Sequence, residues 1–253
     1  MRDIRVRELW QKQQCAFNGW LAIPNSLSAE AMAMSGWDSL TIDMQHGLID
    51  NAALVTMLQA LAASPCTPMV RVPWLDPGPI MRALDAGALG IICPMINSVD
   101  EAARLVEYTS YAPMGGRSFG PIRAGLVDGP HYQASANQRV IRFAMIETRK
   151  ALDQLDAILQ VEGLDAIYVG PSDLSLSLGC KPTLDDVEPT VQQAIEHILE
   201  RAHAHGLKAG IHSQTVNFAK ARKALGYDLV TTASDLRLIL AGAQDLMKAW
   251  RAP

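Results

Sequence analysis

The sequence predicts an α/β protein, a single (β/α)8 TIM barrel that spans residues 1–253, and three observations carry this prediction. Eight short β-rich runs alternate with eight longer segments of helical period along the chain. Strict alternation requires parallel strands, because each crossover returns the chain to the same edge of the sheet, and eight such units close into a barrel. Several runs, such as 89–95, are also apolar nearly throughout, as expected for strands covered on both faces.

An open doubly wound sheet is the alternative architecture. It would place a glycine-rich dinucleotide-binding fingerprint in the turn after the first strand, but that turn reads IPNS at 23–26. The chain also contains no low-complexity tract, linker or short repeat. We therefore expect one closed barrel domain.

The expected strands and helices follow from the hydrophobic periodicity of the sequence and from the glycine, proline and polar residues that separate the periodic runs. The strands cover residues 18–23, 39–44, 68–72, 90–95, 142–147, 166–170, 208–212 and 229–233. The helices cover residues 28–35, 51–63, 76–86, 98–109, 149–161, 187–205, 215–225 and 235–250. Ser98 and Glu101 have the spacing of a capping box, and Asp76 and Asp235 are further candidate helix caps.

One long segment, 111–138, interrupts the alternation. It contains the glycine- and proline-rich clusters MGGRSFGP at 114–121 and DGP at 128–130, so we expect irregular structure there. Long loops in compact domains are usually functional or disordered. Because the segment comes after the fourth strand, we expect it at the end of the barrel where active sites are built.

Composition limits the partners that this chain can have. Of 253 residues, 49% are hydrophobic and 19% are charged, and 22 Lys and Arg against 26 Asp and Glu give a net charge of −4. This balance lacks the basic footprint of a protein that binds nucleic acid or an anionic membrane surface. No apolar run approaches the roughly 18 residues that a membrane span requires.

The N-terminus and the cysteines indicate a cytoplasmic protein. Residues 1–10 are rich in charge and carry no apolar stretch of the kind found in secretory signals. The four cysteines are widely spaced, with no C-x-x-C pair, so we expect free thiols and no zinc or redox motif. Cys93 should be buried in a strand.

Position in the barrel selects the residues that could carry chemistry, because catalytic groups lie at the carboxyl ends of strands and in the loops that follow. Glu147 ends the fifth strand and Asp173 follows the sixth, so their carboxylates can converge over the barrel mouth. Hard divalent cations such as Mg²⁺ take one or two protein carboxylates and leave other positions for water and substrate. The alternative is a helix-entry carboxylate at Glu147 and a turn cap at Asp173.

Two further residues pass the same selection. His46 follows the second strand, and a histidine there can act as a general base near neutral pH, although packed structural histidines are more common. Arg71 ends the third strand and offers a permanently charged fork of donors to a carboxylate or a developing oxyanion. The alternative for Arg71 is an ion pair with Asp43 or another acidic loop residue.

The motifs around these residues resemble the HpcH/HpaI aldolase family. They are LTIDMQHG at 40–47, PMVRV at 68–72, IETR at 146–149 and VEGLDAIYVGPSDLS at 161–175. Members of the family include 4-hydroxy-2-oxoheptanedioate aldolases and 2-dehydro-3-deoxyglucarate aldolases. The resemblance covers nearly the whole chain and implies a metal-dependent (β/α)8 barrel that forms or cleaves 4-hydroxy-2-oxo acids through a pyruvate enolate.

The resemblance also implies roles for individual residues. Glu147 and Asp173 would hold a divalent ion, Mg²⁺, Mn²⁺ or Co²⁺. His46 would be the base, and Arg71 would bind substrate and stabilise the enolate oxygen. Ser172 and Asp173 would offer backbone N–H groups to the pyruvate carboxylate.

Three positions put parts of this resemblance in question. The family aspartate that raises the basicity of the histidine corresponds to Asp85, which falls near a helix end, so its contact with His46 would be indirect or made across a subunit interface. Met145 stands where the family usually has Gln, and a thioether cannot donate the amide hydrogen bond to substrate. His212 ends the seventh strand, where the family more often has an apolar residue. It could face a polar substrate tail, but we expect it to face solvent.

The sequence thus predicts a class II pyruvate aldolase, a carbon–carbon lyase acting on a 2-oxo acid and an aldehyde. The acyl-CoA lyase branch of the same superfamily is one alternative, but the chain has no cluster of basic residues for CoA phosphates. The other is a barrel that binds a ketoacid without catalysis. The resemblance also implies a homo-oligomer, a hexamer built as a trimer of dimers, in which segment 111–138 completes a neighbouring active site. A mobile lid over its own barrel is the competing view of that segment.

Overall fold

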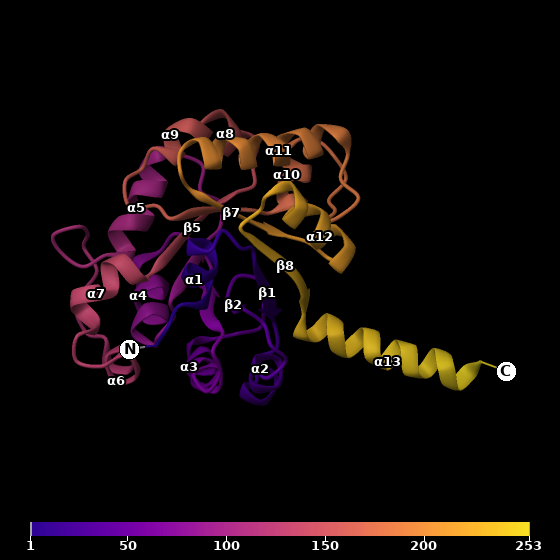
Figure 1. Cartoon of the computed structure of the whole chain (residues 1–253), viewed down its shortest axis with the longest axis horizontal. Coiled ribbons are helices and arrows are strands. Elements are labelled where there is room, and N and C mark those ends of the chain that lie inside the picture. Colours follow the sequence, from indigo (N-terminus) through magenta and orange to yellow (C-terminus); the bar gives the residue numbers. More distant parts are fainter. Residues whose placement is uncertain (1, 253) are drawn as a thin grey trace.

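The computed structural model describes residues 2–252 and confirms the predicted barrel (Figure 1). Its eight strands are all parallel and close in sequence order, β1 beside β2 and β8 beside β1. Their bounds are β1 Ala16–Leu21, β2 Ser39–Asp43, β3 Thr67–Arg71, β4 Gly90–Cys93, β5 Ile141–Ile146, β6 Ala166–Val169, β7 Lys208–His212 and β8 Leu229–Ser234. Each predicted strand is present, with ends that shift by one or two residues.

Helices surround the barrel and supply the other half of each unit. They are α1 Arg5–Gln11, α2 Ser26–Ala33, α3 Asn51–Leu61, α4 Pro77–Asp85, α5 Val99–Thr109, α6 Ile122–Asp128, α7 Tyr132–Arg139, α8 Arg149–Asp153, α9 Leu155–Leu159, α10 Pro171–Ser177, α11 Pro189–Ala204, α12 Val216–Leu225 and α13 Asp235–Arg251. All eight predicted helices are present, but the one expected over 149–161 is broken into α8 and α9. The sequence did not predict α1, α6, α7 or α10.

The structure confirms two of the three predicted helix caps. Ser98 caps α5 by accepting the backbone N–H of Glu101 at 3.3 Å, and Asp76 caps α4 through Gly78 at 2.8 Å. The expected cap at Asp235 is wrong, because Ser234 takes that position. The Asp235 carboxylate instead accepts backbone N–H groups that follow β1, at 2.9 and 3.2 Å, and so ties the end of β8 to the end of β1.

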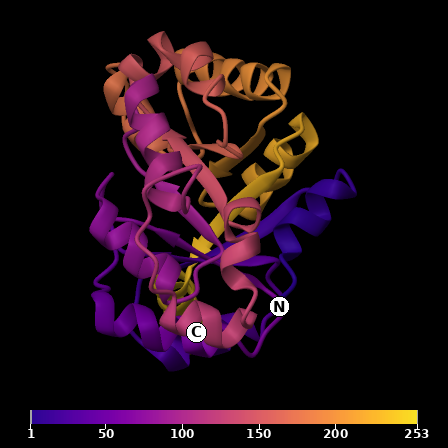
Figure 2. The ribbon, with the colours of Figure 1, turned by 90° about the vertical axis from the view of Figure 1, so that its left-hand side faces the viewer.

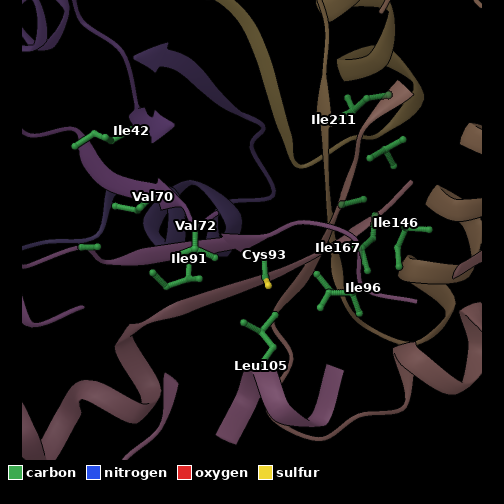
Figure 3. Packing of buried hydrophobic residues seen from close by; sticks show 14 of the residues in the cluster. Ile42, Val70, Val72, Ile91, Cys93, Ile96, Leu105, Ile146, Ile167 and Ile211 are labelled. Atoms are coloured by element: carbon green, nitrogen blue, oxygen red, sulfur yellow. The ribbon is translucent and has the colours of Figure 1, made fainter. Parts of the chain in front are cut away.

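Two apolar layers hold the barrel together. The outer layer lies between strands and helices and is built from the outward-facing residues of the strands, including Ile42, Val70, Ile91, Ile167 and Ile211 (Figure 3). Cys93 belongs to it, fully buried in β4 as predicted, and all four cysteines are free thiols.

The inner layer fills the barrel with large side chains, as closed eight-stranded barrels require. Trp10 of α1 enters it from the amino-terminal end of the strands, with its ring centroid 5.9 Å from that of Phe143. The Trp10 indole also donates to the backbone oxygen of Asp228 at 2.9 Å. Helix α1 therefore closes the amino-terminal end and leaves the carboxyl end as the mouth.

Segment 111–138 differs from both expectations. It contains α6 and nearly all of α7, so half of it is helical, whereas residues 111–121 are irregular. It also lies at the amino-terminal end of the barrel, because it follows a helix, α5, and leads into the start of β5. The Asp128 carboxylate of this segment pairs with Arg2 at 2.8 Å, and Figures 1 and 2 show α6 beside the start of the chain. The segment cannot be a lid over its own barrel mouth.

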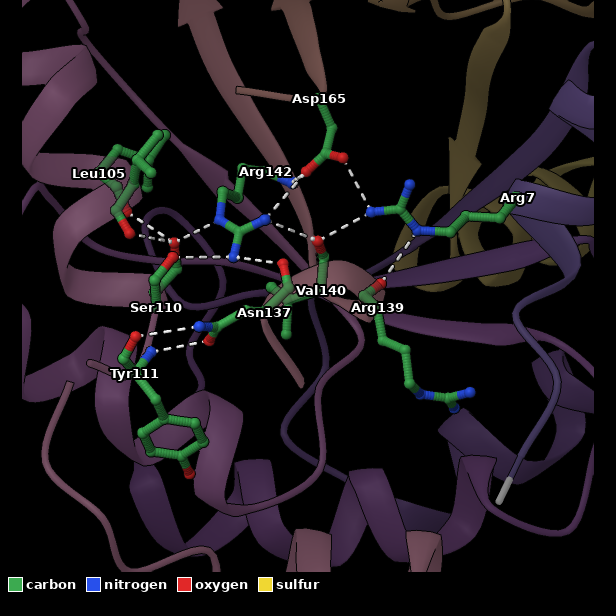
Figure 4. Close-up of polar contacts among 11 residues, drawn as sticks. Arg7, Leu105, Ser110, Tyr111, Asn137, Arg139, Val140, Arg142 and Asp165 are labelled. Atoms are coloured by element: carbon green, nitrogen blue, oxygen red, sulfur yellow. Dashed lines mark hydrogen bonds and ion pairs between the residues drawn. The ribbon is translucent and has the colours of Figure 1, made fainter. Parts of the chain in front are cut away.

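A buried polar cluster fixes the segment to β5 (Figure 4). Arg142, near the start of β5, donates to the backbone oxygens of Asn137 and Val140 at 2.9 and 3.2 Å and pairs with Asp165 at 3.3 Å. Arg7 of α1 reaches the same Asp165 carboxylate at 2.8 Å. These contacts give the amino-terminal end a rigid, well-paired floor.

Helix α13 leaves the body of the barrel, as Figure 1 shows clearly. Every residue of α13 after Asp235 is exposed, in contrast to the other long helices, which bury one face. Within residues 2–252, no helix combines the length and the apolar character needed to cross a membrane.

Candidate active site

The barrel mouth gathers polar residues from several strands. Asp43 ends β2 and is the register partner of Arg71, which ends β3, while Glu147 follows β5 directly. Beside them, a cavity of about 350 Å³ opens at the mouth. Its lining includes Trp20, Asp43, His46, His212, Ser213 and Arg237. Of the residues predicted from strand ends, His46 lines this cavity, whereas Arg71, Glu147 and Asp173 lie outside its lining.

Glu147 is a buried carboxylate with no ion pair among residues 2–252, although the charge of Arg71 is close enough to lower its pKa. It is 2% exposed, and its Oε1 atom accepts the backbone N–H of Met95 at 2.8 Å. Burial raises the pKa of Glu147 to about 7; the hydrogen bond from Met95 lowers it, and the nearby charge of Asp173 raises it. An ionised carboxylate in this position calls for a cation.

The backbone around Glu147 is shaped to receive it. Met95 has φ of 56°, a left-handed conformation that costs free energy in a non-glycine residue and that turns its N–H toward the carboxylate. On the other side, a Cβ atom at Gly170 would overlap the Glu147 Oε2 atom. The position after β6 must therefore remain glycine for the carboxylate to fit.

Asp173 lies in the first turn of α10 and is exposed. Within residues 2–252, no hydrogen-bond donor or cation contacts its carboxylate, although it is close enough to Glu147 to influence its pKa. Two adjacent carboxylates, one buried, form a set that a hard divalent cation fits. No group of three or more His, Cys, Asp or Glu side chains in the described chain is arranged around a metal site, so these two would leave other coordination positions open.

Arg71 is held in a fork by Asp43. Its Nε and Nη2 atoms donate to the two Asp43 oxygens at 2.8 and 2.7 Å, which is the ion pair that the alternative interpretation expected. The third nitrogen, Nη1, has no acceptor in the described chain. Arg71 is therefore fixed by Asp43 and can still donate to a bound molecule, since its side chain remains 13% exposed at the mouth.

Asp43 is the functional residue that sequence reasoning underrated. Its carboxylate also accepts the Trp20 indole N–H at 3.1 Å and the backbone N–H groups of Gln45 and His46 at 3.1 and 3.3 Å. Burial alone would raise the pKa of Asp43, but the hydrogen bonds and charge of Arg71 hold it below its usual value. Asp43 thus stays ionised and fixes both Arg71 and the loop that carries His46.

His46 lies in that loop, exposed, on the lining of the mouth cavity. A Cβ atom at Gly47 would overlap the backbone oxygen of Asp43, so glycine at 47 lets the loop fold back over the end of β2. The backbone N–H groups of Ser172 and Asp173, in the first turn of α10, have no acceptor within the part of the chain that the structure describes. They remain free to bind an anion.

Asp85 is not brought together with the other predicted residues. It ends α4, at the amino-terminal end of the barrel, and its carboxylate pairs with Arg117 at 2.6 Å. Arg117 lies over the ring of Tyr111, 4.3 Å from its centroid, and donates to the Tyr132 hydroxyl at 3.0 Å. Within one chain, Asp85 therefore clamps segment 111–138 and has no contact with His46.

His212 contradicts the expectation that it faces solvent. It is the last residue of β7 and points into the barrel, where its ring packs edge-on against Trp20 with centroids 4.7 Å apart. Its Nδ1 atom is 3.1 Å from the hydroxyl oxygen of Tyr168. Met145, the departure from the family pattern, is 2% exposed in the inner layer beside Gly170, so the thioether forms an apolar floor below Glu147.

Known proteins are similar to this chain over nearly its whole length. The model of the family described as HpcH/HpaI aldolase/citrate lyase matches residues 17–241. The chain is 44% identical to a hydroxypyruvate/pyruvate aldolase of Rhizorhabdus wittichii, over 98% of this chain and 99% of the relative. It is 35% identical to a 5-keto-4-deoxy-D-glucarate aldolase of Salmonella arizonae, over 94% and 93%.

A solved structure has the same fold over the same length. The crystal structure of a HpcH/HpaI aldolase/citrate lyase family protein from Burkholderia cenocepacia superimposes with a TM-score of 0.91, at 30% identity over 98% of each chain.

Proposed function

Because this chain belongs to the HpcH/HpaI aldolase/citrate lyase family, we propose that it is a metal-dependent, class II pyruvate aldolase. Its reaction would be the reversible cleavage of 4-hydroxy-2-oxo acids to pyruvate and an aldehyde. The name of the relative from Rhizorhabdus wittichii, a hydroxypyruvate/pyruvate aldolase, supports pyruvate and equally hydroxypyruvate as the 2-oxo acid. The observation that carries the proposal is Glu147, a buried carboxylate beside Asp173 and a free face of Arg71, without a cation of its own.

In this proposal Glu147 and Asp173 hold Mg²⁺, Mn²⁺ or Co²⁺. The ion would supply Lewis-acid polarisation of the 2-oxo group, which makes the neighbouring methyl protons removable. The free backbone N–H groups of Ser172 and Asp173 bind the substrate carboxylate and so set the position of the 2-oxo group. Met145 offers only an apolar surface to the bound acid, so orientation depends on these donors and on Arg71.

Arg71 and His46 handle charge and protons. With Nε and Nη2 committed to Asp43, Arg71 presents its remaining donor to the oxygen that becomes negative in the enolate. In cleavage, His46 takes the proton of the 4-hydroxyl, directly or through a water, while the bond between C3 and C4 breaks. The aldehyde leaves, and the enolate then takes a proton at C3 to give pyruvate.

The site is tested by pyruvate release from a panel of 4-hydroxy-2-oxo acids, measured after metal stripping and again after Mg²⁺, Mn²⁺ or Co²⁺ is added. We expect activity only with metal. Glu147→Gln and Asp173→Asn should each lose metal binding and turnover, because a neutral amide cannot replace the charge that holds a hard cation. Full activity in the stripped enzyme would remove the class II mechanism. Metal-dependent pyruvate binding without turnover would instead favour the non-catalytic barrel.

We also propose that the protein is a homo-oligomer, with the hexamer, a trimer of dimers, as the specific form. Large exposed apolar patches mark interaction surfaces. The exposed apolar residues of α13 are Leu236, Leu238, Ile239, Leu240, Leu246, Met247 and Trp250. Light scattering coupled to size exclusion measures the assembly, and a monomer at micromolar concentration would contradict the proposal.

Segment 111–138 and Asp85 belong to this oligomer proposal. Both lie at the end of the barrel remote from their own mouth, and Asp85 is occupied by Arg117. An effect of Asp85 on the basicity of His46, or of the segment on substrate, therefore requires a neighbouring subunit. We propose that the segment completes the adjacent active site in this way.

A further inference from the structure

His212 carries a lone pair that the proposed reaction does not use. Its Nδ1 atom contacts the hydroxyl oxygen of Tyr168, a fully buried residue of β6. The Tyr168 hydroxyl donates to the Thr231 hydroxyl oxygen at 2.7 Å, and Thr231 also accepts from the Asn18 side-chain amide at 2.9 Å. This polar network runs across the inside of the barrel beneath His212.

The network determines which His212 nitrogen bears the proton. A phenol has one proton, and the proton of Tyr168 is given to Thr231. The contact at 3.1 Å therefore needs a proton on Nδ1, so that His212 donates to the phenol oxygen. In a neutral imidazole, the other nitrogen, Nε2, is then an acceptor.

His212 is held in this neutral form. Burial and the charge of Arg71 lower its pKa to about 3, so the ring carries no charge near neutral pH. The edge-on packing against Trp20 fixes the plane of the ring. Nε2 has no partner in the described part of the chain and belongs to a residue that lines the mouth cavity.

The cavity shows which part of a substrate would meet Nε2. It is shared by His212 and by His46, the residue proposed to act at the 4-hydroxyl. The carbons on either side of the bond that forms or breaks, C3 and C4 with their substituents, therefore enter this cavity. An apolar side chain at 212 would offer them only van der Waals contact, whereas His212 offers a fixed acceptor.

We propose that the Nε2 atom of His212 accepts a hydrogen bond from a substrate hydroxyl, so that this enzyme selects hydroxylated substrates over those with a methyl group in the same place. The inference rests on the proposed aldolase function. The hydroxyl has two possible sources, C3 of the 2-oxo acid donor and the carbon next to the aldehyde group. Leaving this acceptor unpaired beneath a bound substrate that excludes water should cost about 5- to 100-fold in kcat/KM.

The experiment compares matched substrates that differ by one hydroxyl. Condensation rates are measured for hydroxypyruvate against 2-oxobutanoate with one aldehyde, and for glycolaldehyde against propanal with pyruvate. His212→Phe keeps an aromatic ring against Trp20 and Tyr168 but removes the acceptor. We expect the wild-type preference for the hydroxylated partner to collapse in this variant in at least one arm, and that arm identifies the source of the hydroxyl.

Tyr168→Phe tests the positioning role, because it removes the group that holds the Nδ1 proton. It should weaken the same preference, and the ¹⁵N chemical shifts of His212 should change from one dominant tautomer to a mixture. His203→Phe is the matched control, since His203 is a surface residue of α11, paired with Asp228 at 2.9 Å and remote from the mouth. It should change neither measurement.

The outcomes separate this inference from the proposed function. If the wild-type enzyme condenses pyruvate with no aldehyde, the aldolase proposal itself fails. If it turns over but His212→Phe leaves both substrate ratios unchanged, His212 does not select hydroxyls. A wild-type ¹⁵N spectrum with the proton on Nε2 would also overturn the inference, and it needs neither turnover nor a folded variant.

Discussion

Two arginine–aspartate pairs lie at opposite ends of this barrel, and they differ in which partner is exposed. At the mouth, Arg71 pairs with Asp43 at 2.7 Å, and the arginine is the more exposed partner, 13% against 5%. At the amino-terminal end, Arg117 pairs with Asp85 at 2.6 Å, and there the arginine is fully buried while the aspartate is 22% exposed. The mouth pair leaves its arginine partly exposed, whereas the other pair buries its arginine completely.

The surroundings explain the contrast. Asp43 is saturated by hydrogen bonds from Trp20, from its own loop and from Arg71, so it acts as a fixed anchor for an arginine with a spare donor. Arg117 is instead enclosed by two tyrosine rings and fixes segment 111–138. In the proposed mechanism, the same two residue types would therefore serve catalysis at one end, whereas they fix the structure at the other.

The largest effect expected at the mouth, apart from loss of the metal ligands, is that of His46→Ala. It should lower kcat by roughly 10²- to 10⁴-fold, the usual contribution of a positioned acid–base group. Metal affinity, measured by titration calorimetry, should stay nearly unchanged. A large loss of metal would show that His46 is a ligand and not the base.

The two arginines can be separated by the same substitution. Arg71→Lys should lower kcat/KM by about 10²- to 10³-fold, because a point charge cannot hold the Asp43 fork and reach the enolate oxygen together. Arg117→Lys should instead lower stability by about 1.5 to 3 kcal/mol, because lysine cannot make the hydrogen bonds of the fully buried guanidinium to both Asp85 and Tyr132. Urea unfolding and steady-state kinetics on both variants would reveal this crossed pattern, and wild-type rates from Arg71→Lys would remove Arg71 from the mechanism.

Mixed oligomers test whether the amino-terminal pair also serves a neighbouring mouth. Asp85→Asn subunits and His46→Ala subunits, each impaired alone, should regain part of the activity when they are combined, because some sites then receive both intact parts. The mixing must be verified by mass spectrometry. If verified mixed oligomers show no recovery, Asp85 and its segment act only within their own chain.

Much of this architecture could be predicted because it follows from periodicity. Alternating runs define the eight strands, and strand ends locate His46, Arg71, Glu147 and Asp173. The errors come from tertiary context. The sequence predicts segment 111–138 at the mouth because the segment comes after the fourth strand. In the structure, helix α5 lies between β4 and the segment, so the segment begins at the amino-terminal end of the barrel.

Side-chain direction was the second source of error. The sequence predicts a solvent-facing loop position for His212. In the structure, His212 is the last residue of β7, two residues after Gly210, so both residues lie on the inner face of the strand. The glycine at 210 is the sequence signal for this direction, because a glycine inside a strand often marks a close approach of another group. In the structure, a Cβ atom at Gly210 would lie 2.8 Å from the Tyr168 ring, so this face of β7 points into the barrel. The hydrogen bond from Met95 to Glu147 had no sequence signal, because it depends on a backbone conformation.

A second contrast between the two ends concerns two buried carboxylates whose pKa values move in opposite directions. Burial would raise the pKa of Asp128, but hydrogen bonds from Arg2 hold it below its usual value, so its contribution to stability is present above the ordinary pKa and is lost only in acid. Glu147 is the reverse, with a pKa raised from 4.5 to about 7. In the metal-free protein, its contribution to stability is complete below pH 4.5 and is lost as the pH rises through about 7.

The raised pKa of Glu147 predicts that the stability of the metal-free protein depends on pH. Between pH 5 and pH 8, metal-free wild-type protein should lose about 2.5 kcal/mol of unfolding free energy relative to Glu147→Gln, which has no proton to lose. Mg²⁺ should abolish this loss in the wild type, because a cation replaces the proton as the partner of the buried charge. Urea unfolding at the two pH values, with and without Mg²⁺, measures the difference. A wild-type curve parallel to that of Glu147→Gln would mean that Glu147 is already ionised in the metal-free site, and the contrast between the two ends would then rest on the arginines alone.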